Sequence, residues 1–237
     1  MNQAKPTHIV TGASAGMGTA VARRLVQTGR RVIAPGRNEA ALEALREELG
    51  PDFDPFTADL SEPDQIETFC ESVTNESIKL KGLIFCSGLA VPAKVTQTTA
   101  ESVDQMFDIN TRAPMLLTAR LAGLLQDSNG DVVFINSSAS RTPGMDRAVY
   151  SASKAALASF ADCVRGELNP GGVRVATIYP GRTATPGVEP VRQYYRDTVD
   201  MRRLLQPDDI AALVIHILDA PDNVEITDIH LRRRWPD

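Results

Sequence analysis

The sequence predicts an α/β protein with a doubly wound parallel sheet of about seven strands and helices on both faces. Short runs rich in Val and Ile are almost continuously apolar, which is typical of strands buried on both faces of a parallel sheet. Longer segments between them carry apolar residues at helical spacing. No repeat, low-complexity tract or long linker interrupts this alternation. The chain therefore predicts one domain over residues 1–237.

Seven short segments are predicted to form the strands. Six of them are short apolar runs, and the third, residues 53–60, is a further strand-like segment. They cover residues 8–11, 31–34, 53–60, 82–86, 131–136, 173–179 and 224–231.

The helical segments carry recognisable signals at their ends. Four apolar residues between positions 17 and 25 fall on one helical face, and Gly29 stands where that helix should end. After the third strand, Ser61 is expected to cap a helix that has Pro63 near its start. Pro207, followed by two aspartates, repeats this signature ahead of residues 210–218.

Composition excludes several classes of protein. The 30 acidic and 25 basic residues give a net charge of −5, which argues against a general nucleic-acid binder. No apolar run is long enough for a transmembrane helix, and the polar residues 1–6 do not resemble a secretory signal. The three cysteines have no paired spacing, and the three histidines form no zinc motif. We therefore expect a cytoplasmic protein with free thiols, no metal and no membrane partner.

A glycine-rich turn joins the first strand to the first helix. Gly12 allows a tight turn out of the strand, Gly16 lets the backbone approach a pyrophosphate, and Gly18 lets the helix lie close to the sheet. Free N–H groups and the helix dipole then face the phosphates. We expect a dinucleotide to bind here, with Ser14 and Met17 also in contact with it.

The end of the second strand favours NADP over NAD. A carboxylate usually holds the adenosine ribose here, but this chain has Gly36 and Arg37, and a guanidinium can grip a 2′-phosphate. The alternative is that Arg37 is a solvated loop residue. At the end of the third strand, Asp59 would accept a hydrogen bond from the adenine amino group, with Leu60 beside the ring. The alternative is that Asp59 belongs to the turn before Ser61.

A tyrosine and a lysine one helical turn apart suggest acid–base chemistry. Tyr150 and Lys154 share one helical face, and a cation beside a phenol lowers its pKa, which suits general acid–base catalysis. Ser137 directly follows the strand at residues 131–136, at the edge of the sheet where chemistry is expected. A tyrosine–lysine pair alone is more often a surface feature.

Together these motifs resemble the short-chain dehydrogenase/reductase family, in its NADP-preferring branch. The glycine pattern T-G-x-x-x-G-x-G, the Y-x-x-x-K pattern and the serine before it occur in the family's order, and the similarity covers essentially the whole chain. Further matches are Asn110 of the family's tetrad and Thr185, near the nicotinamide amide. The resemblance implies a single-domain Rossmann fold and a homodimer or homotetramer.

The resemblance also implies roles for the matched residues. Tyr150 would exchange a proton with the substrate oxygen, and Ser137 would hydrogen-bond the carbonyl. Lys154 would hold the nicotinamide ribose and depress the tyrosine pKa, and Asn110 would position a water for proton relay. The implied cofactor contacts beyond the glycine turn are Arg37, Asp59, Leu60, Gly88, Tyr150, Lys154, Pro180, Gly181, Thr183 and Thr185.

One motif departs from the family. Its N-N-A-G after the fourth strand is replaced by residues 85–88, of which only Gly88 is retained, so hydrogen bonds made by the asparagines must come from elsewhere. Cys86 in this motif is expected to be a small packing residue rather than a reactive thiol, because no cation near it in sequence would activate it.

Residues 183–206, which have no clear period, follow the carboxyl end of the sixth strand. We expect this segment to cover the substrate; the alternative is a surface excursion. Arg141, Thr142 and Met145 either face the substrate or are exposed loop residues. Arg182 either reaches an anionic group or is a surface charge. The basic tail at residues 232–235 either packs on a neighbouring subunit or is solvated.

These expectations predict an NADP(H)-dependent carbonyl reductase or alcohol dehydrogenase acting on a small or medium molecule. One alternative is a non-catalytic protein that senses NADP(H) with the same fold. A sensor does not need a proton relay, so the set Asn110, Ser137, Tyr150 and Lys154 favours the enzyme. A second alternative is an epimerase or dehydratase, although the chain leaves little room for a larger substrate domain.

Overall fold

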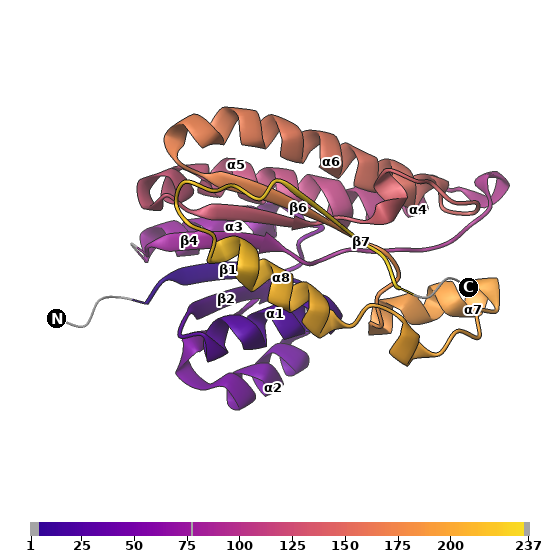
Figure 1. The fold of residues 1–237 in the computed structure, drawn as a ribbon, viewed down its shortest axis with the longest axis horizontal. Coiled ribbons are helices and arrows are strands. Elements are labelled where there is room, and N and C mark those ends of the chain that lie inside the picture. The colour runs from indigo at the N-terminus through magenta and orange to yellow at the C-terminus, as the bar shows by residue number, and fades with distance from the viewer. Residues whose placement is uncertain (1–4, 77, 235–237) are drawn as a thin grey trace.

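A seven-stranded parallel sheet forms the centre of the molecule, as expected (Figure 1). The computed structural model describes residues 5–76 and 78–234; residues 1–4 and Trp235 of the basic tail lie outside them. The strand order is β3-β2-β1-β4-β5-β6-β7, so it reverses between β1 and β4. The strands are β1 (Thr7–Thr11), β2 (Arg31–Gly36), β3 (Phe53–Thr57), β4 (Leu80–Phe85), β5 (Asp131–Ile135), β6 (Arg174–Pro180) and β7 (Asp228–Leu231).

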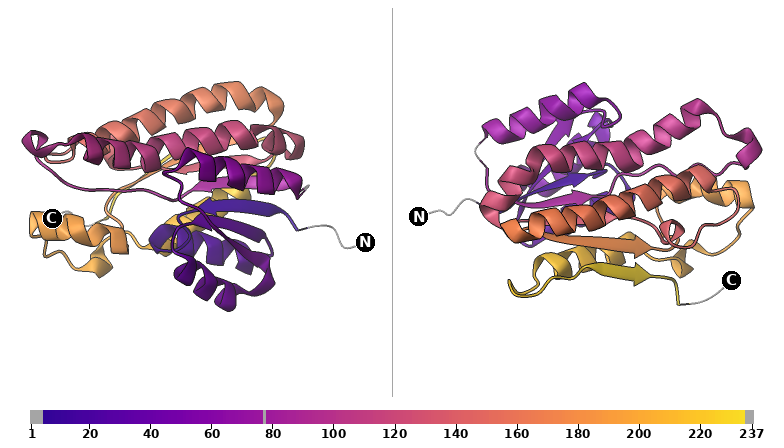
Figure 2. Two further views of the ribbon diagram at one scale, coloured as in Figure 1. Left: turned by 180° about the vertical axis from the view of Figure 1, so that it is seen from behind. Right: turned by 90° about the horizontal axis from the view of Figure 1, so that it is seen from above.

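Helices cover both faces of the sheet (Figures 1 and 2). One layer contains α1 (Gly16–Gln27), α2 (Glu39–Leu49) and α8 (Pro207–Leu218). The other contains α3 (Pro63–Asn75), α5 (Ala113–Ser128) and α6 (Ala148–Leu168). The helix α4 (Ala100–Phe107) continues into α5 through a single π turn, Asp108–Arg112.

Two apolar cores result, because successive residues of a strand point to opposite faces. In β1, Ile9 packs with the α3, α5 and α6 layer, whereas Val10 packs with the α1, α2 and α8 layer. Both side chains are fully buried. The almost unbroken apolar runs in the sequence have this origin.

Two element ends differ from the prediction. Ser61 does not cap α3: Glu62 occupies the cap position, and Ser61 instead bonds to Asp59 through both its N–H and its hydroxyl group. The last strand begins at Asp228, later than predicted. The Val175 N–H of β6 donates to the Glu225 carboxylate, so it is not available to bond to the backbone of a longer β7.

The segment at residues 183–206 folds into short helices. It contains α7 (Glu189–Tyr195) and the 3₁₀ turns Pro186–Val188 and Met201–Arg203. A parallel bridge between Thr183 and Leu205 closes its base. Figure 2 shows it at the carboxyl end of the sheet, toward which the strand arrows point.

No helix within the described residues is both long enough and apolar enough to span a membrane. All three cysteines, Cys70, Cys86 and Cys163, are free thiols, as expected.

A buried histidine lies in β1. His8 is 3% exposed, and its Nδ1 lies 3.3 Å from the Pro6 carbonyl oxygen. Its ring fills the space above Gly82, where an added Cβ would lie 2.5 Å from the His8 Cδ2. Burial, reinforced by the positive charges of Arg30 and Lys81, lowers the pKa of His8 from 6.5 to about 3. The folded protein therefore holds this imidazole neutral.

We predict that His8 makes stability depend on pH. The unfolded chain binds a proton near pH 6.5, whereas the folded chain does so only near pH 3. Stability is therefore full above pH 6.5 and falls by about 1.4 kcal/mol per pH unit toward pH 3. In urea unfolding, the native protein should lose about 2 kcal/mol more than His8→Gln between pH 7 and pH 5. Equal losses in the two proteins would contradict this prediction.

Candidate active site

Two adjoining cavities lie at the carboxyl edge of the sheet. The first measures about 700 Å³ and lies over β1, β2 and β4; the second measures about 530 Å³ and lies over β4, β5 and β6. They share wall residues and together lie across the point where the strand order reverses, where ligands bind in such sheets; we call the two adjoining cavities the groove. The shared wall residues are Met17, Cys86, Ser87, Gly88, Leu89, Thr185 and Gly187.

The glycine turn forms one end of the first cavity. Gly12 and Gly16 have φ angles of +70° and +58°, which favour glycine, and both line the cavity together with Ser14 and Met17. Gly18 lies outside both cavities; a Cβ there would lie 2.2 Å from the Gly12 carbonyl oxygen. Gly18 thus allows α1 to pack closely on the turn, and a contact of Gly18 with a cofactor stays a prediction.

Hydrogen bonds from Ser87 strengthen the motif that departs from the family. Its N–H donates to the Thr11 Oγ1 over 3.2 Å, and the two hydroxyl groups lie 2.9 Å apart. These bonds join the carboxyl ends of β1 and β4, and the sequence analysis did not identify them. The neighbouring Cys86 packs on the core, and burial raises the pKa of its thiol to about 12. Cys86 thus packs on the core and also lines both cavities, and its lack of reactivity stays a prediction.

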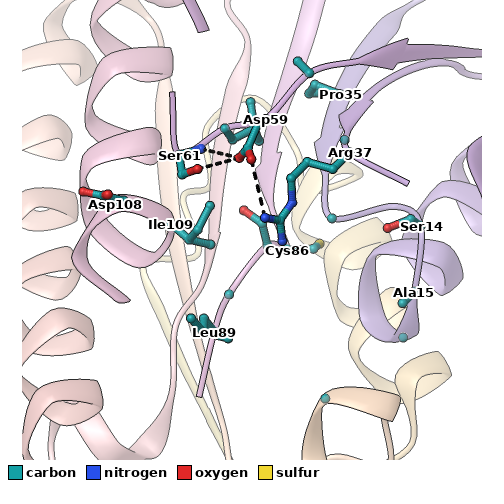
Figure 3. Close-up of a pocket in the computed structure, with 18 of the residues that line it drawn as sticks. Ser14, Ala15, Pro35, Arg37, Asp59, Ser61, Cys86, Leu89, Asp108 and Ile109 are labelled. Atoms are coloured by element: carbon teal, nitrogen blue, oxygen red, sulfur yellow. Dashed lines mark hydrogen bonds and ion pairs between the residues drawn. The ribbon is translucent and has the colours of Figure 1, made fainter. Parts of the chain in front are cut away.

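At the far end of the first cavity, the Arg37 Nη1 lies 3.5 Å from the Asp59 Oδ2 (Figure 3). Asp59 also accepts hydrogen bonds from the N–H and hydroxyl of Ser61, so it belongs to that turn and still lines the cavity beside Leu60. Burial alone would raise the pKa of Asp59, but the Ser61 bonds and the Arg37 charge outweigh it and lower the pKa. The Arg37 side chain is 69% exposed, so most of its donors face solvent.

Ser137, Tyr150 and Lys154 all line the second cavity. The Lys154 Nζ is buried and donates to the Ile135 carbonyl oxygen over 3.2 Å. Asn136, which the sequence analysis did not single out, bonds to both neighbours: its amide donates to the Lys154 carbonyl and accepts from the Ser137 N–H. The end of β5 is thereby attached to α6, which carries the tyrosine and the lysine.

The electrostatics of this group differ from the expectation. Burial raises the pKa of Tyr150 above its ordinary value; a hydrogen bond with Ser137 and the charge of Arg147 act in the opposite direction without outweighing it. Lys154 is not among the groups that lower the pKa of Tyr150. Burial lowers its own pKa to about 8 instead. At neutral pH the phenol therefore keeps its proton.

Asn110 lies behind the cavities. Its Oδ1 accepts from the Leu89 N–H, and its Nδ2 donates to the Leu89 carbonyl and to the Ser153 hydroxyl. An added Cβ on Gly88 would lie 3.4 Å from both the Asn110 Oδ1 and the Lys154 Nζ. The side chain of Asn110 thus holds the wall that contains Gly88. A water role for Asn110 stays a prediction.

The last strands complete the second cavity. Pro180, Gly181 and Thr183 line it, and Thr185 lines both cavities. The Gly181 N–H donates to the Leu231 carbonyl over 2.8 Å, which fixes this turn against β7.

The predicted substrate loop lies elsewhere. Arg141, Thr142 and Met145 line neither cavity. Arg141 donates to the Tyr179 hydroxyl over 3.1 Å and stacks on its ring, and Met145 is 87% exposed. Arg147, which follows shortly after, lines the second cavity and was missed by the sequence analysis.

Metal ligands do not cluster anywhere in the described ranges, 5–76 and 78–234: no group of three His, Cys, Asp or Glu side chains there could hold an ion.

Known proteins share this arrangement. The family model described as short chain dehydrogenase matches residues 6–196. An uncharacterized oxidoreductase of Staphylococcus epidermidis is 29% identical over 225 residues, which cover 94% of this chain and 95% of the relative. The NADP-dependent 3-hydroxy acid dehydrogenase of Escherichia coli K12 is 30% identical over 234 residues, which cover 94% and 93%.

Solved structures show the same fold. Serine dehydrogenase in its closed form, complexed with NADP⁺, gives a TM-score of 0.85 at 28% identity over 95% of this chain and 94% of that one. A metagenomic short-chain oxidoreductase in complex with NADP gives 0.83 at 27% identity over 98% of both chains. The family match runs from before β1 through α7, so it includes every part of the groove described above except the tail after β7. The chain therefore belongs to the short-chain dehydrogenases, a family of nicotinamide-dependent oxidoreductases.

Proposed function

We propose that this protein is an NADP(H)-dependent oxidoreductase that interconverts a carbonyl and a secondary alcohol, with Tyr150 as general acid and base. The observation that carries the proposal is the gathering of Ser137, Tyr150 and Lys154 in a cavity that adjoins the one at the glycine turn. A protein that only sensed the nucleotide would have no need of a tyrosine and a serine beside a buried lysine in the adjoining cavity.

The first cavity fits the adenosine and pyrophosphate parts of a dinucleotide. The turn at Gly12 and Gly16 presents backbone without side chains at the N-terminus of α1, where N–H groups and the helix dipole favour phosphate. Arg37 would hold a 2′-phosphate at the other end, and Asp59 would keep its guanidinium in place. The relatives with NADP in their names support the preference for NADP.

Proton transfer would pass through the second cavity. A bound nicotinamide supplies or accepts the hydride. Tyr150 donates its proton to the substrate oxygen, which its raised pKa suits, because the phenol is protonated at neutral pH. Ser137 bonds to the same oxygen as negative charge develops there. Lys154, with a pKa of about 8, can exchange a proton near neutral pH and would also hold the ribose hydroxyls.

Residues 183–206 would cover the substrate. Pro190 and Val191 of this segment line the second cavity, and the Tyr195 hydroxyl bonds to the Met145 carbonyl across the opening between α7 and the loop before α6. We also propose a homodimer or homotetramer, as the family resemblance implies, and a cytoplasmic location.

We predict that native protein oxidises NADPH in the presence of some members of a panel of ketones, aldehydes and diketones. Tyr150→Phe should lose about 100-fold or more in kcat, because the proton donor is removed, and should bind NADPH as before. Tyr194→Phe is the matched control, since Tyr194 is exposed and lines neither cavity. Equal turnover by Tyr150→Phe would reject the tyrosine's role. Tight NADPH binding without turnover of any carbonyl would favour the sensor.

We predict that Arg37→Ala weakens NADPH binding by about tenfold and leaves NADH binding almost unchanged, because only NADPH carries the phosphate that the guanidinium would hold. Calorimetric titration of both cofactors measures this. Arg46→Ala is the control, since Arg46 pairs with Asp54 and lies outside the first cavity. An equal loss for both cofactors would reject the 2′-phosphate role.

A further inference from the structure

The two cavities carry opposite charge. Among the described residues, the first is lined by one arginine, Arg37, and by three acidic residues, Asp59, Glu62 and Asp108. The second has no Asp or Glu in its described lining and five basic residues, namely Arg147, Lys154, Arg182, Arg232 and Arg233. This contrast occurs in a chain with more acidic than basic residues. The excess of positive charge thus lies away from the glycine turn, where the cofactor phosphates would bind.

Arg147 is held in place within this lining. It stands directly before α6, three residues ahead of Tyr150. Its guanidinium carbon lies 4.9 Å from the centre of the Tyr195 ring, and its Nε donates to the Tyr195 hydroxyl over 3.3 Å. That hydroxyl in turn donates to the Met145 carbonyl over 2.7 Å. Stacking and these bonds orient the guanidinium before any ligand binds.

Arg147 has no acidic partner among the residues that the structure describes. Within residues 5–76 and 78–234, no carboxylate lies within ion-pair distance of it. Arg182 differs, because its guanidinium pairs with Asp197. Partly buried cations usually have a counterion, and the guanidinium edge is shaped to take a carboxylate through two parallel hydrogen bonds.

The charge of Arg147 also reaches the reacting group. It is one of the two influences that lower the pKa of Tyr150 against the effect of burial. A molecule whose carbonyl oxygen is bonded to Tyr150 therefore has Arg147 within electrostatic range. An anionic group on that same molecule would be attracted to Arg147 and not repelled by any acidic side chain of the described lining.

We propose that the substrate carries a carboxylate that Arg147 binds, so that the protein interconverts an oxo acid and a hydroxy acid. This inference rests on the proposed reductase function and adds the substrate class. In the reducing direction, the carbonyl carbon would accept a hydride from NADPH, and the carbonyl oxygen would accept a proton from Tyr150. The products are NADP⁺ and the hydroxy acid, and the carboxylate is unchanged.

The test compares each acid with its own methyl ester. Acetoacetate and 4-oxopentanoate are assayed against their methyl esters by NADPH oxidation, with native protein, Arg147→Gln and Arg147→Lys. The acid-to-ester ratio of kcat/KM is the readout, because a change in the pKa of Tyr150 affects both members of a pair. The ratio should fall by about tenfold or more in Arg147→Gln and recover in part in Arg147→Lys.

Arg141→Gln is the matched control. Arg141 lies six residues before Arg147 and also stacks on a tyrosine, but it lines neither cavity, so this variant should keep the native ratio. Esters that are turned over as well as the acids by native protein would overturn the carboxylate inference and leave the reductase intact. So would an unchanged ratio in Arg147→Gln.

A binding measurement separates this inference from the proposed function. Calorimetry of 4-oxopentanoate with the NADPH complex of Tyr150→Phe needs no turnover. Binding should be about tenfold weaker when Arg147→Gln is added to this variant. Such Arg147-dependent binding without turnover by native protein would support the carboxylate site and count against the reductase. Equal binding with and without Arg147→Gln would overturn the proposed carboxylate site.

Discussion

Three stretches of backbone meet at the glycine turn with no room for a side chain between them, and the position of the whole groove depends on this contact. A Cβ on Gly12 would lie 2.8 Å from the backbone of Ser87, and one on Gly18 would lie 2.2 Å from the Gly12 carbonyl. Close packing here brings the N-terminus of α1 to the point where the strand order reverses. The hydrogen bonds between Thr11 and Ser87 hold the two central strands at the same place.

In the second cavity, a buried side chain fixes the spacing of the reactive groups, and burial shifts their pKa values. Asn136 joins the end of β5 to the backbone of Lys154, so the serine, tyrosine and lysine keep a fixed spacing. The same dry surroundings move the two titratable groups in opposite directions: the pKa of Tyr150 rises and that of Lys154 falls to about 8. One physical cause thus gives a phenol that retains its proton beside an amine that exchanges its own more readily.

The sequence predicted the features that depend on residues close together in the chain, and it missed those that depend on contacts between distant residues. Apolar runs predicted the inner strands best, since β1, β2, β4, β5 and β6 are buried on both faces of the sheet. The edge strands β3 and β7 are more exposed and more polar, and the start of β7 was predicted too early. Ser61 was assigned wrongly as a cap because a side-chain contact with Asp59 competes for it. Arg147 was missed because its place depends on Tyr195, 48 residues later, and spacing in the sequence carries no sign of such a contact.

The bridge between Thr183 and Leu205 has a consequence for how this protein can diversify. The bridge closes this segment at its base, next to β6 and α8, so the residues between Thr183 and Leu205 form a loop whose two ends are held together. Insertions within such a tethered loop cost little, because closure entropy grows only slowly with length. Substitutions and insertions in this loop can therefore change the lining of the second cavity, while the sheet, the glycine turn and the helix that carries Tyr150 keep their structure.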